Sequence, residues 1–412
     1  MFRIVKFPVK LEPFFTGLEL FFHWDHFTYF RTLTLLFAFA WGRRNISNLY
    51  RYIDSDLETC PHRTRFNDFL LVARWDPAAA LRQKTQAILK SLKPQPGEVL
   101  YLIIDSSAKK KSGKHMEGVS KIKDTNTGAY YMGHTYIEAI VHFRNFIIPS
   151  GMRLYVKPEE CLSLDIVFYK LTQWAAQLIR EFEAPEGIKV VVLFDSFFLC
   201  PVVLHACRDK GFRFISTLKS NRNLFKGGRK LKTGKYGRNL FRRGSKTGIT
   251  LPKEAGGKTY QFIDVGWIQV SKVGLAHVVF SRRGQSDNIL GLITDDPDLS
   301  AKKIIQYYDG RWEVEVFNKE VKQHLGLGQY QNLPYEAAVK HLHLVCFAYA
   351  LLTHLAIMAH DEKGKRKSAA RIPVSSLQNE LRRMVWDDLA KHLKELPDGN
   401  AVIKELGRLL VA

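Results

Sequence analysis

The sequence predicts an α/β fold, and three observations lead to this prediction. Two apolar, partly β-branched runs, 99–104 and 190–194, each end in an aspartate, Asp105 and Asp195. Runs of this length and composition are typical of strands buried on both faces of a sheet. The regions before and after them carry apolar residues at helical spacing. Aspartates at strand ends lie where open α/β sheets usually place their chemistry, although each alone also fits a helix cap or a turn.

The charge balance points to a polyanionic partner. Lys and Arg outnumber Asp and Glu by 22 in 412 residues, while 46% hydrophobic and 25% charged residues are ordinary for a soluble globular protein. Nucleic acid and an anionic membrane would both satisfy this charge. Phe14–Trp41 is interrupted by polar residues, and Leu342–Met358 is short for a span, so both are expected to be core helices. Nucleic acid is therefore favoured, and we expect no membrane association and no secretory leader.

The cysteines indicate a reducing compartment. Their number is odd, and their spacing does not match a metal site. We expect small buried hydrophobes in a cytoplasmic protein. The five are Cys60, Cys161, Cys200, Cys207 and Cys346.

Residues 1–90 are predicted to be mostly helical. Asn45 starts a helix with a good capping residue, and a second helix carries His62, Arg63 and Arg65. Such a pair is compatible with a DNA-binding helix pair or with a small bundle bearing ordinary surface arginines. Ser91–Gly97, with two prolines, is predicted to be a linker.

The region from Glu98 to Leu218 is predicted to alternate strands and helices. Asp105 is followed by an expected basic loop of lysines and His115, which is either simply solvated or in contact with phosphates. One or two antiparallel strands are expected over Tyr130–Phe146, and another strand over Phe212–Leu218. Helices are expected over Ser163–Phe182 and Pro201–Lys210. The lysines are Lys109, Lys110, Lys111 and Lys114.

Residues 219–285 form a basic segment that is too long for a plain loop. The segment opens with Lys219 and Arg222, and no acidic residue occurs between Asp209 and Glu254. Cations interleaved with aromatics and glycines favour a surface that follows phosphates over a merely solvated loop. Strands are expected over 261–270 and 275–281.

The stretch Tyr307–Lys322 carries the most informative pattern. On a continuous helix, five polar side chains fall within an arc of roughly 80°, while Glu313 and Phe317 point the other way. Such a face is either a surface ion-pair ladder or a metal-ligating carboxylate flanked by phosphate-binding groups. The five are Tyr308, Arg311, Glu315, Lys319 and Lys322.

The C-terminal region is expected to be helical. The apolar helix Val339–Met358 is expected to pack on the sheet, and a charged break is expected over Asp361–Lys367. One or two terminal helices follow, which either form a dimer contact or cap the core.

The spacing Tyr308-x2-Arg311-x3-Glu315-x6-Lys322 resembles the Tyr-Arg-Glu-Lys signature of bacterial insertion-sequence transposases of the DDE (Asp-Asp-Glu) class, the group of the Tn-five enzyme. Three further blocks are similar to that family. They are IIDSSAKKKSGKHMEGVSK around Asp105, the block from Asp195 that begins DSFFLCPVVL, and HLGLGQYQ after Lys322. The resemblance covers roughly Phe27 to Ile357.

This resemblance implies a domain organisation. A ribonuclease H-like catalytic domain would comprise 98–218 and 286–358, with a basic β-rich subdomain inserted at 219–285. Residues 1–90 would be a helical DNA-binding region, and 359–412 would be C-terminal helices.

The resemblance also implies site residues. Asp105, Asp195 and Glu315 would hold two Mg²⁺ (or Mn²⁺) ions, and Tyr308, Arg311 and Lys322 would bind phosphates. Weaker candidates for DNA contact are Lys319, Lys219, Arg222 and Trp267. Trp267 is either a base-stacking wedge near a DNA end or a core tryptophan.

The implied activity is DNA transposition: metal-dependent cleavage at terminal inverted repeats and strand transfer into target DNA. The partner would be double-stranded DNA, bound by a homodimer on the bacterial nucleoid. Two alternatives remain: a catalytically inactive or domesticated sequence-specific DNA-binding protein, and a stand-alone nuclease.

Overall fold

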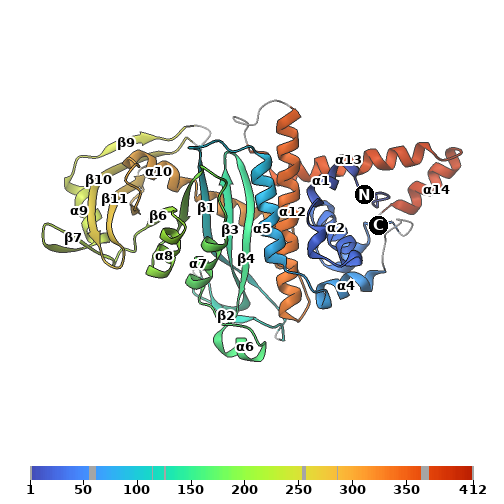
Figure 1. Ribbon diagram of the computed structural model, residues 1–412, viewed down its shortest axis with the longest axis horizontal. Helices are drawn as coiled ribbons and strands as arrows, with labels where there is room; N and C mark the ends of the chain where they lie inside the picture. Colours follow the sequence, from blue (N-terminus) through green and yellow to red (C-terminus); the bar gives the residue numbers. More distant parts are fainter. Residues whose placement is uncertain are drawn as a thin grey trace.

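The computed structural model describes residues 2–54, 62–113, 115–124, 127–252, 257–284, 286–362 and 371–410. Cys60, Lys114, Glu254 and residues 363–367 lie outside the described residues. The molecule is elongated, with a β-rich end, a central sheet and a helical end that contains both termini (Figure 1).

The central sheet has the mixed strand order β4-β3-β1-β5-β6. Its strands are β1 (Val99–Lys110), β3 (Tyr130–Phe143), β4 (Phe146–Tyr155), β5 (Lys189–Phe194) and β6 (Arg213–Thr217). The first three strands pair antiparallel, whereas β5 is parallel to both β1 and β6. A short strand, β2 (Ser120–Lys123), pairs with the start of β3. The strands expected over 99–104, 130–146, 190–194 and 212–218 are confirmed.

Strand β1 is longer than expected. It continues to Lys110, which pairs with Gly133 of β3, so Lys109 and Lys110 belong to the strand. The prediction of a basic loop directly after Asp105 was wrong for these two residues, because the ladder with β3 continues past the aspartate.

The helix expected over Ser163–Phe182 was also wrong. Helix α6 (Pro158–Ser163) ends where that helix was expected to begin, and α7 (Leu171–Glu181) starts only at Leu171, while α8 (Pro201–Asp209) follows as expected. Asp165 lies between α6 and α7 with a positive φ of 51°, a conformation that ends a helix. Val167, in the segment between α6 and α7, is 72% exposed.

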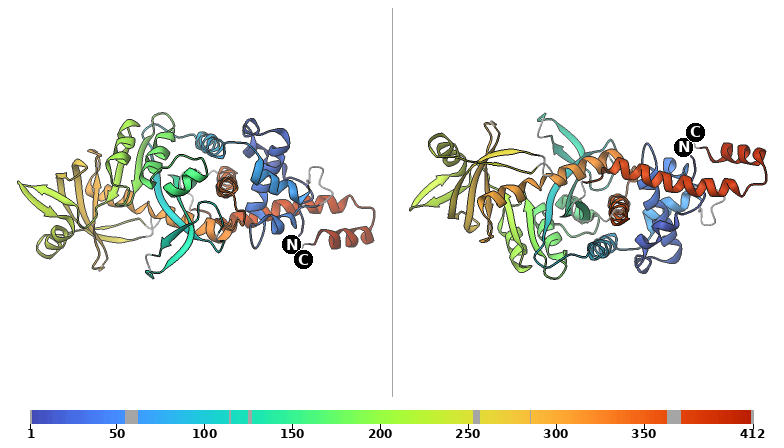
Figure 2. Two further views of the ribbon diagram at one scale, coloured as in Figure 1. Left: turned by 90° about the horizontal axis from the view of Figure 1, so that it is seen from below. Right: turned by 90° about the horizontal axis from the view of Figure 1, so that it is seen from above.

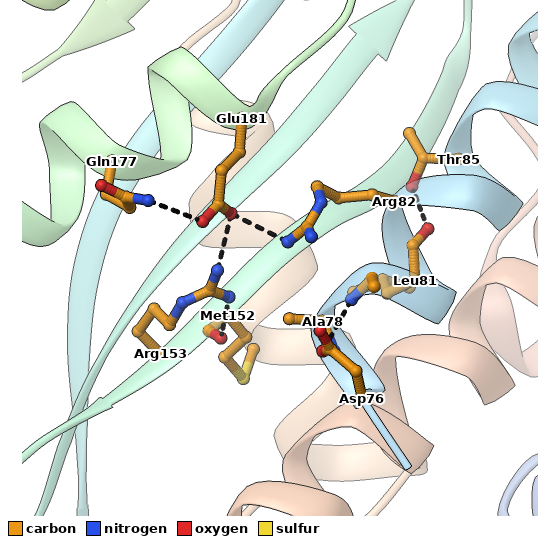
Figure 3. Close-up of polar contacts among 10 residues, drawn as sticks. Asp76, Ala78, Leu81, Arg82, Thr85, Met152, Arg153, Gln177 and Glu181 are labelled. Atoms are coloured by element: carbon orange, nitrogen blue, oxygen red, sulfur yellow. Dashed lines mark hydrogen bonds and ion pairs between the residues drawn. The ribbon is translucent and has the colours of Figure 1, made fainter. Parts of the chain in front are cut away.

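An ion-pair cluster joins α7 to the sheet and to α5 (Pro77–Ser91) (Figure 3). The Glu181 carboxylate accepts from Arg153 of β4 at 2.6 Å and from Arg82 of α5 at 3.0 Å, and Gln177 donates to its other oxygen. Because all three charges are largely covered, this cluster fixes α7 against one face of the sheet.

The sheet continues into the 219–285 segment through β12 (Ile289–Thr294), which pairs with β6. Beyond it lie β11 (Gly274–Arg283), β10 (Thr259–Val270), β7 (Asn223–Lys226) and β8 (Arg229–Lys232), and β9 (Thr247–Thr250) also pairs with β10. The two strands expected over 261–270 and 275–281 are confirmed as β10 and β11. Part of the basic run forms the helix α9 (Thr233–Arg243).

The N-terminal region is helical, as expected. It contains η1 (Val9–Leu11), α1 (Glu12–Phe15), η2 (Glu19–Phe21), α2 (Trp24–Phe39), α3 (Ile46–Tyr50), α4 (Arg63–Val72) and α5. Asn45 caps α3, because its side chain accepts from the amide of Asn48 at 2.9 Å. Whether α3 and α4 bind DNA stays a prediction.

The long helix α12 (Tyr335–Glu362) joins the helical end to the sheet. Thr353 donates to the carbonyl of Ile147 in β4, and Phe347 packs edge-on against Phe30 of α2. Among the described helices, α12 alone is long and apolar enough to cross a membrane, but 83% of its apolar window is buried inside the protein. Helix α12 is therefore a buried core helix that packs against the sheet, as expected.

The C-terminal helices α13 (Val374–Lys394) and α14 (Gly399–Leu409) pack back on the N-terminal region (Figure 2). Gln378 donates to the carbonyl of Ala38, and Phe2 forms a β-bridge with Leu410. These contacts agree with helices that cap the core, whereas a dimer contact stays a prediction.

Candidate active site

Three carboxylates come from two interior strands of the central sheet and from a helix that packs against β1. Asp105 lies in β1, and Asp195 follows the last residue of β5, the parallel neighbour of β1. Glu315 lies in the first turn of α11 (Trp312–His324). The negative charges of Glu315 and Asp195 both act on Asp105. The three side chains predicted as metal ligands are therefore near enough to influence one another electrostatically, and their binding of metal stays a prediction.

The guanidinium of Arg311 lies between these carboxylates. It is 3.4 Å from Asp105 Oδ2 and 3.5 Å from Glu315 Oε1. Burial lowers the pKa of Arg311, but the Tyr308 phenol and the three carboxylates outweigh it and raise the pKa overall. Arg311 is thus a permanently charged group that holds mutually repelling carboxylates together.

The prediction of a single continuous helix over Tyr307–Lys322 was wrong, because the chain forms two helices there. Helix α10 (Ala301–Asp309) ends before Gly310, and Arg311 is the N-cap of α11. The amides of Gly310 and Arg311 donate to the carbonyls three residues before them, which tightens the chain into a turn. Glycine favours this break because it is a weak helix former.

Tyr308 still reaches the site across that turn. Burial raises the pKa of the Tyr308 phenol, and Arg311 and Thr217 lie beside it. The opposite side of α11 is arranged as expected. Glu313 pairs with Arg371 at 2.7 Å, and Phe317 packs on Tyr349. Glu315, and not Glu313, therefore faces the other carboxylates.

Asp105 carries the clearest electrostatic signal. Burial raises its pKa to about 6, Arg311 offsets this only in part, and the neighbouring carboxylates add to the rise. The Arg311 charge therefore does not fully offset the cost of burying this carboxylate. Such a shift is typical of functional carboxylates, although structural ion pairs also produce it.

The donor set suits a divalent cation such as Mg²⁺, which prefers carboxylate oxygens. Within the described ranges, no three potential ligands are already close enough to enclose one ion. Arg311 is within 3.5 Å of both Asp105 and Glu315. The carboxylates therefore have the chemistry to bind the ion, and binding requires the Arg311 guanidinium to move away from them.

The remaining cations of α11 differ in exposure. Lys322 donates to the hydroxyl of Ser107 in β1 at 2.6 Å, and burial lowers the pKa of its ammonium group. Lys319 is exposed to solvent. Both lie on the helix that carries Glu315, and their contact with phosphates stays a prediction.

The three candidates from the inserted segment have different surroundings. Lys219 lies 5.8 Å from the ring centre of Phe197, two residues after Asp195. Arg222 donates to the carbonyls of Leu199 and Ser271, so it joins the insertion to the segment between β5 and α8. Trp267 is 42% exposed and lies beside His277, so the core alternative for this tryptophan was wrong. DNA contact by these residues stays a prediction.

Sequence reasoning missed the buried polar groups beneath the site. Glu138 interrupts the apolar strand β3, is 1% exposed and pairs in register with Asp105. Asn318 of α11 donates to Glu138 Oε1. An acidic residue inside an otherwise apolar strand was the available signal, because such a residue is rarely buried without a partner.

The HLGLGQYQ block after α11 forms a tightly packed loop. Gly326 and Gly328 have φ of 71° and 74°, and a Cβ on them would lie 2.6 Å from Arg44 and 2.5 Å from Lys109. Lys111 donates to the carbonyls of Gly328 and Tyr330. The loop therefore connects the N-terminal helices to β1.

Comparison with known proteins identifies the family. A sequence model described as "DDE superfamily endonuclease" matches residues 35–272, more than half of the chain, including Asp105 and Asp195 but not Glu315. No curated protein matches the sequence. Among solved structures, the chain is similar to that of a piggyBac transposase synaptic complex with hairpin DNA. The match has 11% identity and a TM-score of 0.48, and covers 94% of this chain and 76% of that chain. The chain therefore belongs to the DDE superfamily of endonucleases.

Proposed function

We propose that the protein is a DDE transposase of the Tyr-Arg-Glu-Lys group, encoded by a bacterial insertion sequence. It cuts DNA at the terminal inverted repeats of that element and joins the ends to target DNA. The observation that carries the proposal is the position of Arg311 between Asp105 and Glu315, with Asp195 directly after the adjacent parallel strand. Arg311 and Glu315 are central members of the four-residue signature.

Asp105, Asp195 and Glu315 would hold two Mg²⁺ ions. Bound Mg²⁺ lowers the pKa of an attacking water or 3′-hydroxyl and stabilises the leaving oxygen. Arg311 holds the carboxylates together before the ions enter, since it offsets their repulsion in the metal-free protein. Once released from the carboxylates, its planar guanidinium can bind a phosphate through two parallel hydrogen bonds.

The other predicted DNA contacts extend from this centre. Tyr308, Lys319 and Lys322 would position the phosphates at the cleaved end, and Lys219, Arg222 and Trp267 would contact the flanking duplex. The excess of 22 positive charges supports a long double-stranded DNA partner. We propose a homodimer that holds two element ends, in the cytoplasm and on the nucleoid.

The test is cleavage of linear DNA carrying the terminal repeats of the element that encodes the chain, with Mg²⁺. Glu315→Gln and Glu313→Gln form a matched pair on one helix, because only Glu315 faces the other carboxylates. We expect cleavage at the repeat boundary by the wild type and by Glu313→Gln, and a loss of at least 100-fold for Glu315→Gln.

Other outcomes would favour the alternatives. Binding of the repeats without cleavage by any of the three proteins indicates a DNA-binding protein that has lost catalysis. Cleavage without preference for the repeats, and without strand transfer, indicates a stand-alone nuclease. Equal loss in both variants contradicts the assignment of Glu315, provided that both remain folded by circular dichroism.

A further inference from the structure

A fourth carboxyl group lies directly beside Asp105. Glu138 of β3 is the register partner of Asp105 of β1, and partners in a ladder project to the same face. Glu138 is 1% exposed, and burial raises its pKa well above the usual range. None of the predicted metal or DNA contacts involves it.

The two oxygens of Glu138 differ. Oε1 accepts from the side-chain amide of Asn318 in α11, and the Asn318 carbonyl accepts from the Tyr136 hydroxyl at 3.3 Å. Oε2 is buried and has no hydrogen-bond partner among the described residues. Glu138, Asn318 and Tyr136 thus form a buried chain of hydrogen bonds between β3 and α11, here called the β3–α11 chain.

This chain links the two elements that carry Asp105 and Glu315. Asn318 lies three residues after Glu315, which is nearly one helical turn, so its bond determines the rotation and height of that turn. Glu138 lies opposite Asp105, so the other end of the bond is at the level of the first aspartate. A second link, from Lys322 to Ser107, holds the end of the same helix to β1.

Burying a carboxyl group that uses only one of its oxygens is costly, and an apolar residue of similar size would avoid that cost. A buried polar link of this kind gives directional specificity that apolar packing lacks. We therefore propose that Glu138 and Asn318 are positioning residues, which set the distance of Glu315 from Asp105. The proposal deepens the proposed function and rests on it for the catalytic consequence only.

The proposed role needs a hydrogen-bond acceptor at 138 and not a negative charge. Glutamine keeps a side-chain carbonyl that can accept from Asn318, whereas leucine removes the acceptor at similar volume. Glu138→Gln should therefore behave as the wild type, and Glu138→Leu and Asn318→Leu should behave alike. Gln323→Ala is a control on an exposed position of the same helix.

The first measurement is amide hydrogen exchange of the metal-free protein without DNA. Exchange in α11 is compared with that in α8, which lies outside the β3–α11 chain. We expect the two leucine variants to exchange at least tenfold faster in α11 with α8 unchanged, while Glu138→Gln and Gln323→Ala match the wild type. Leucine variants with wild-type exchange in α11, or with equal acceleration in both helices, overturn the proposal.

The second measurement separates kcat from KM in cleavage of the terminal repeats. A positioning role predicts a kcat at least tenfold lower in each leucine variant, with KM for DNA within twofold of the wild type. The double variant should be no worse than either single one, because both break the same link. If Glu138→Gln loses as much activity as Glu138→Leu, the carboxylate charge itself is needed and the proposal is wrong.

The two measurements also separate this proposal from the proposed function. If the wild-type protein cuts no repeat DNA, the transposase assignment fails. The exchange of α11 still decides whether Glu138 and Asn318 position this helix.

Discussion

The carboxylate of Asp105 lies 3.4 Å from the guanidinium of Arg311, yet the pKa of Asp105 is raised to about 6. Burial is the largest cause, and the neighbouring carboxylates add to it. One arginine therefore does not neutralise this part of the molecule. In the metal-free protein, the site is a source of instability at neutral pH that a bound cation would relieve.

This shift predicts a pH dependence of stability. Because the folded-state pKa of Asp105 is above its unfolded value, the folded state holds the proton more tightly. The resulting stabilisation is complete below about pH 4 and is lost as the pH rises through about 6. In EDTA, Asp105→Asn should therefore raise the free energy of unfolding at pH 7 by up to about 3 kcal/mol. Urea denaturation of the wild type and the variant from pH 4 to pH 8 measures this difference in unfolding free energy. An equal increase at pH 4 and at pH 8 contradicts the prediction.

Lys111 should make the stability depend on pH in the opposite direction to Asp105. Burial lowers its pKa to about 7, so between about pH 7 and pH 10 the unfolded state binds more protons than the folded state. The contribution of Lys111 to stability should therefore increase as the pH rises. Lys111→Met removes this dependence, and the difference in unfolding free energy between wild type and variant should move in favour of the wild type from pH 6.5 to pH 9. A difference independent of pH would show that Lys111 titrates normally.

Gly326 should be intolerant of a side chain because of packing. Gly326 and Gly228 both have φ of 71°, but a Cβ would meet Arg44 at 2.6 Å in the first and nothing within 4 Å in the second. Gly228→Ala should cost about 1 kcal/mol from the backbone conformation alone. Gly326→Ala should cost at least about 2 kcal/mol more, from overpacking. Equal losses in urea denaturation would show that Arg44 moves aside freely.

Arg371 should stabilise α11 from its far side. Its guanidinium binds Glu313, Glu320 and the hydroxyl of Tyr349, and Glu320 is only 13% exposed. Arg371→Gln leaves that carboxylate without its charge partner and should cost about 2–4 kcal/mol. The control is Arg383→Gln, which breaks an exposed pair with Glu380 and should cost less than about 1 kcal/mol. Thermal unfolding of both variants at low salt measures the difference, and similar losses would contradict it.

Local patterns in the sequence were enough to predict the central strands β1, β3, β5 and β6 and the strands β10 and β11, but not β2, β7, β8, β9 or β12. Apolar runs that end in Asp105 and Asp195 predict buried strands, because few other structures bury so many consecutive apolar residues. The four-residue spacing around Glu315 placed Arg311 and Glu315 together. The order of parallel and antiparallel strands could not be obtained from these patterns, since pairing depends on residues far apart in the chain.

Other predictions failed where local geometry competes with pattern. The helix expected from Ser163 starts only at Leu171, because Asp165 adopts a left-handed backbone conformation that periodicity does not reveal. The helix expected over Tyr307–Lys322 breaks at Gly310. There the backbone amides donate to carbonyls three residues earlier, in place of the regular helical hydrogen bonds to the fourth preceding residue. The domain boundaries, the metal ions and the DNA contacts stay predictions.

The sequence by itself determined the chemistry available to this protein: three candidate carboxylates, a basic insertion and a large positive charge. Only the tertiary structure decided how these groups are held. Strand register placed Glu138 beside Asp105, chain folding brought Arg371 to the back of α11, and the loop at Gly326 closed on Arg44. The physical reason is that burial and hydrogen bonding depend on partners distant in sequence, whereas residue type and spacing are local.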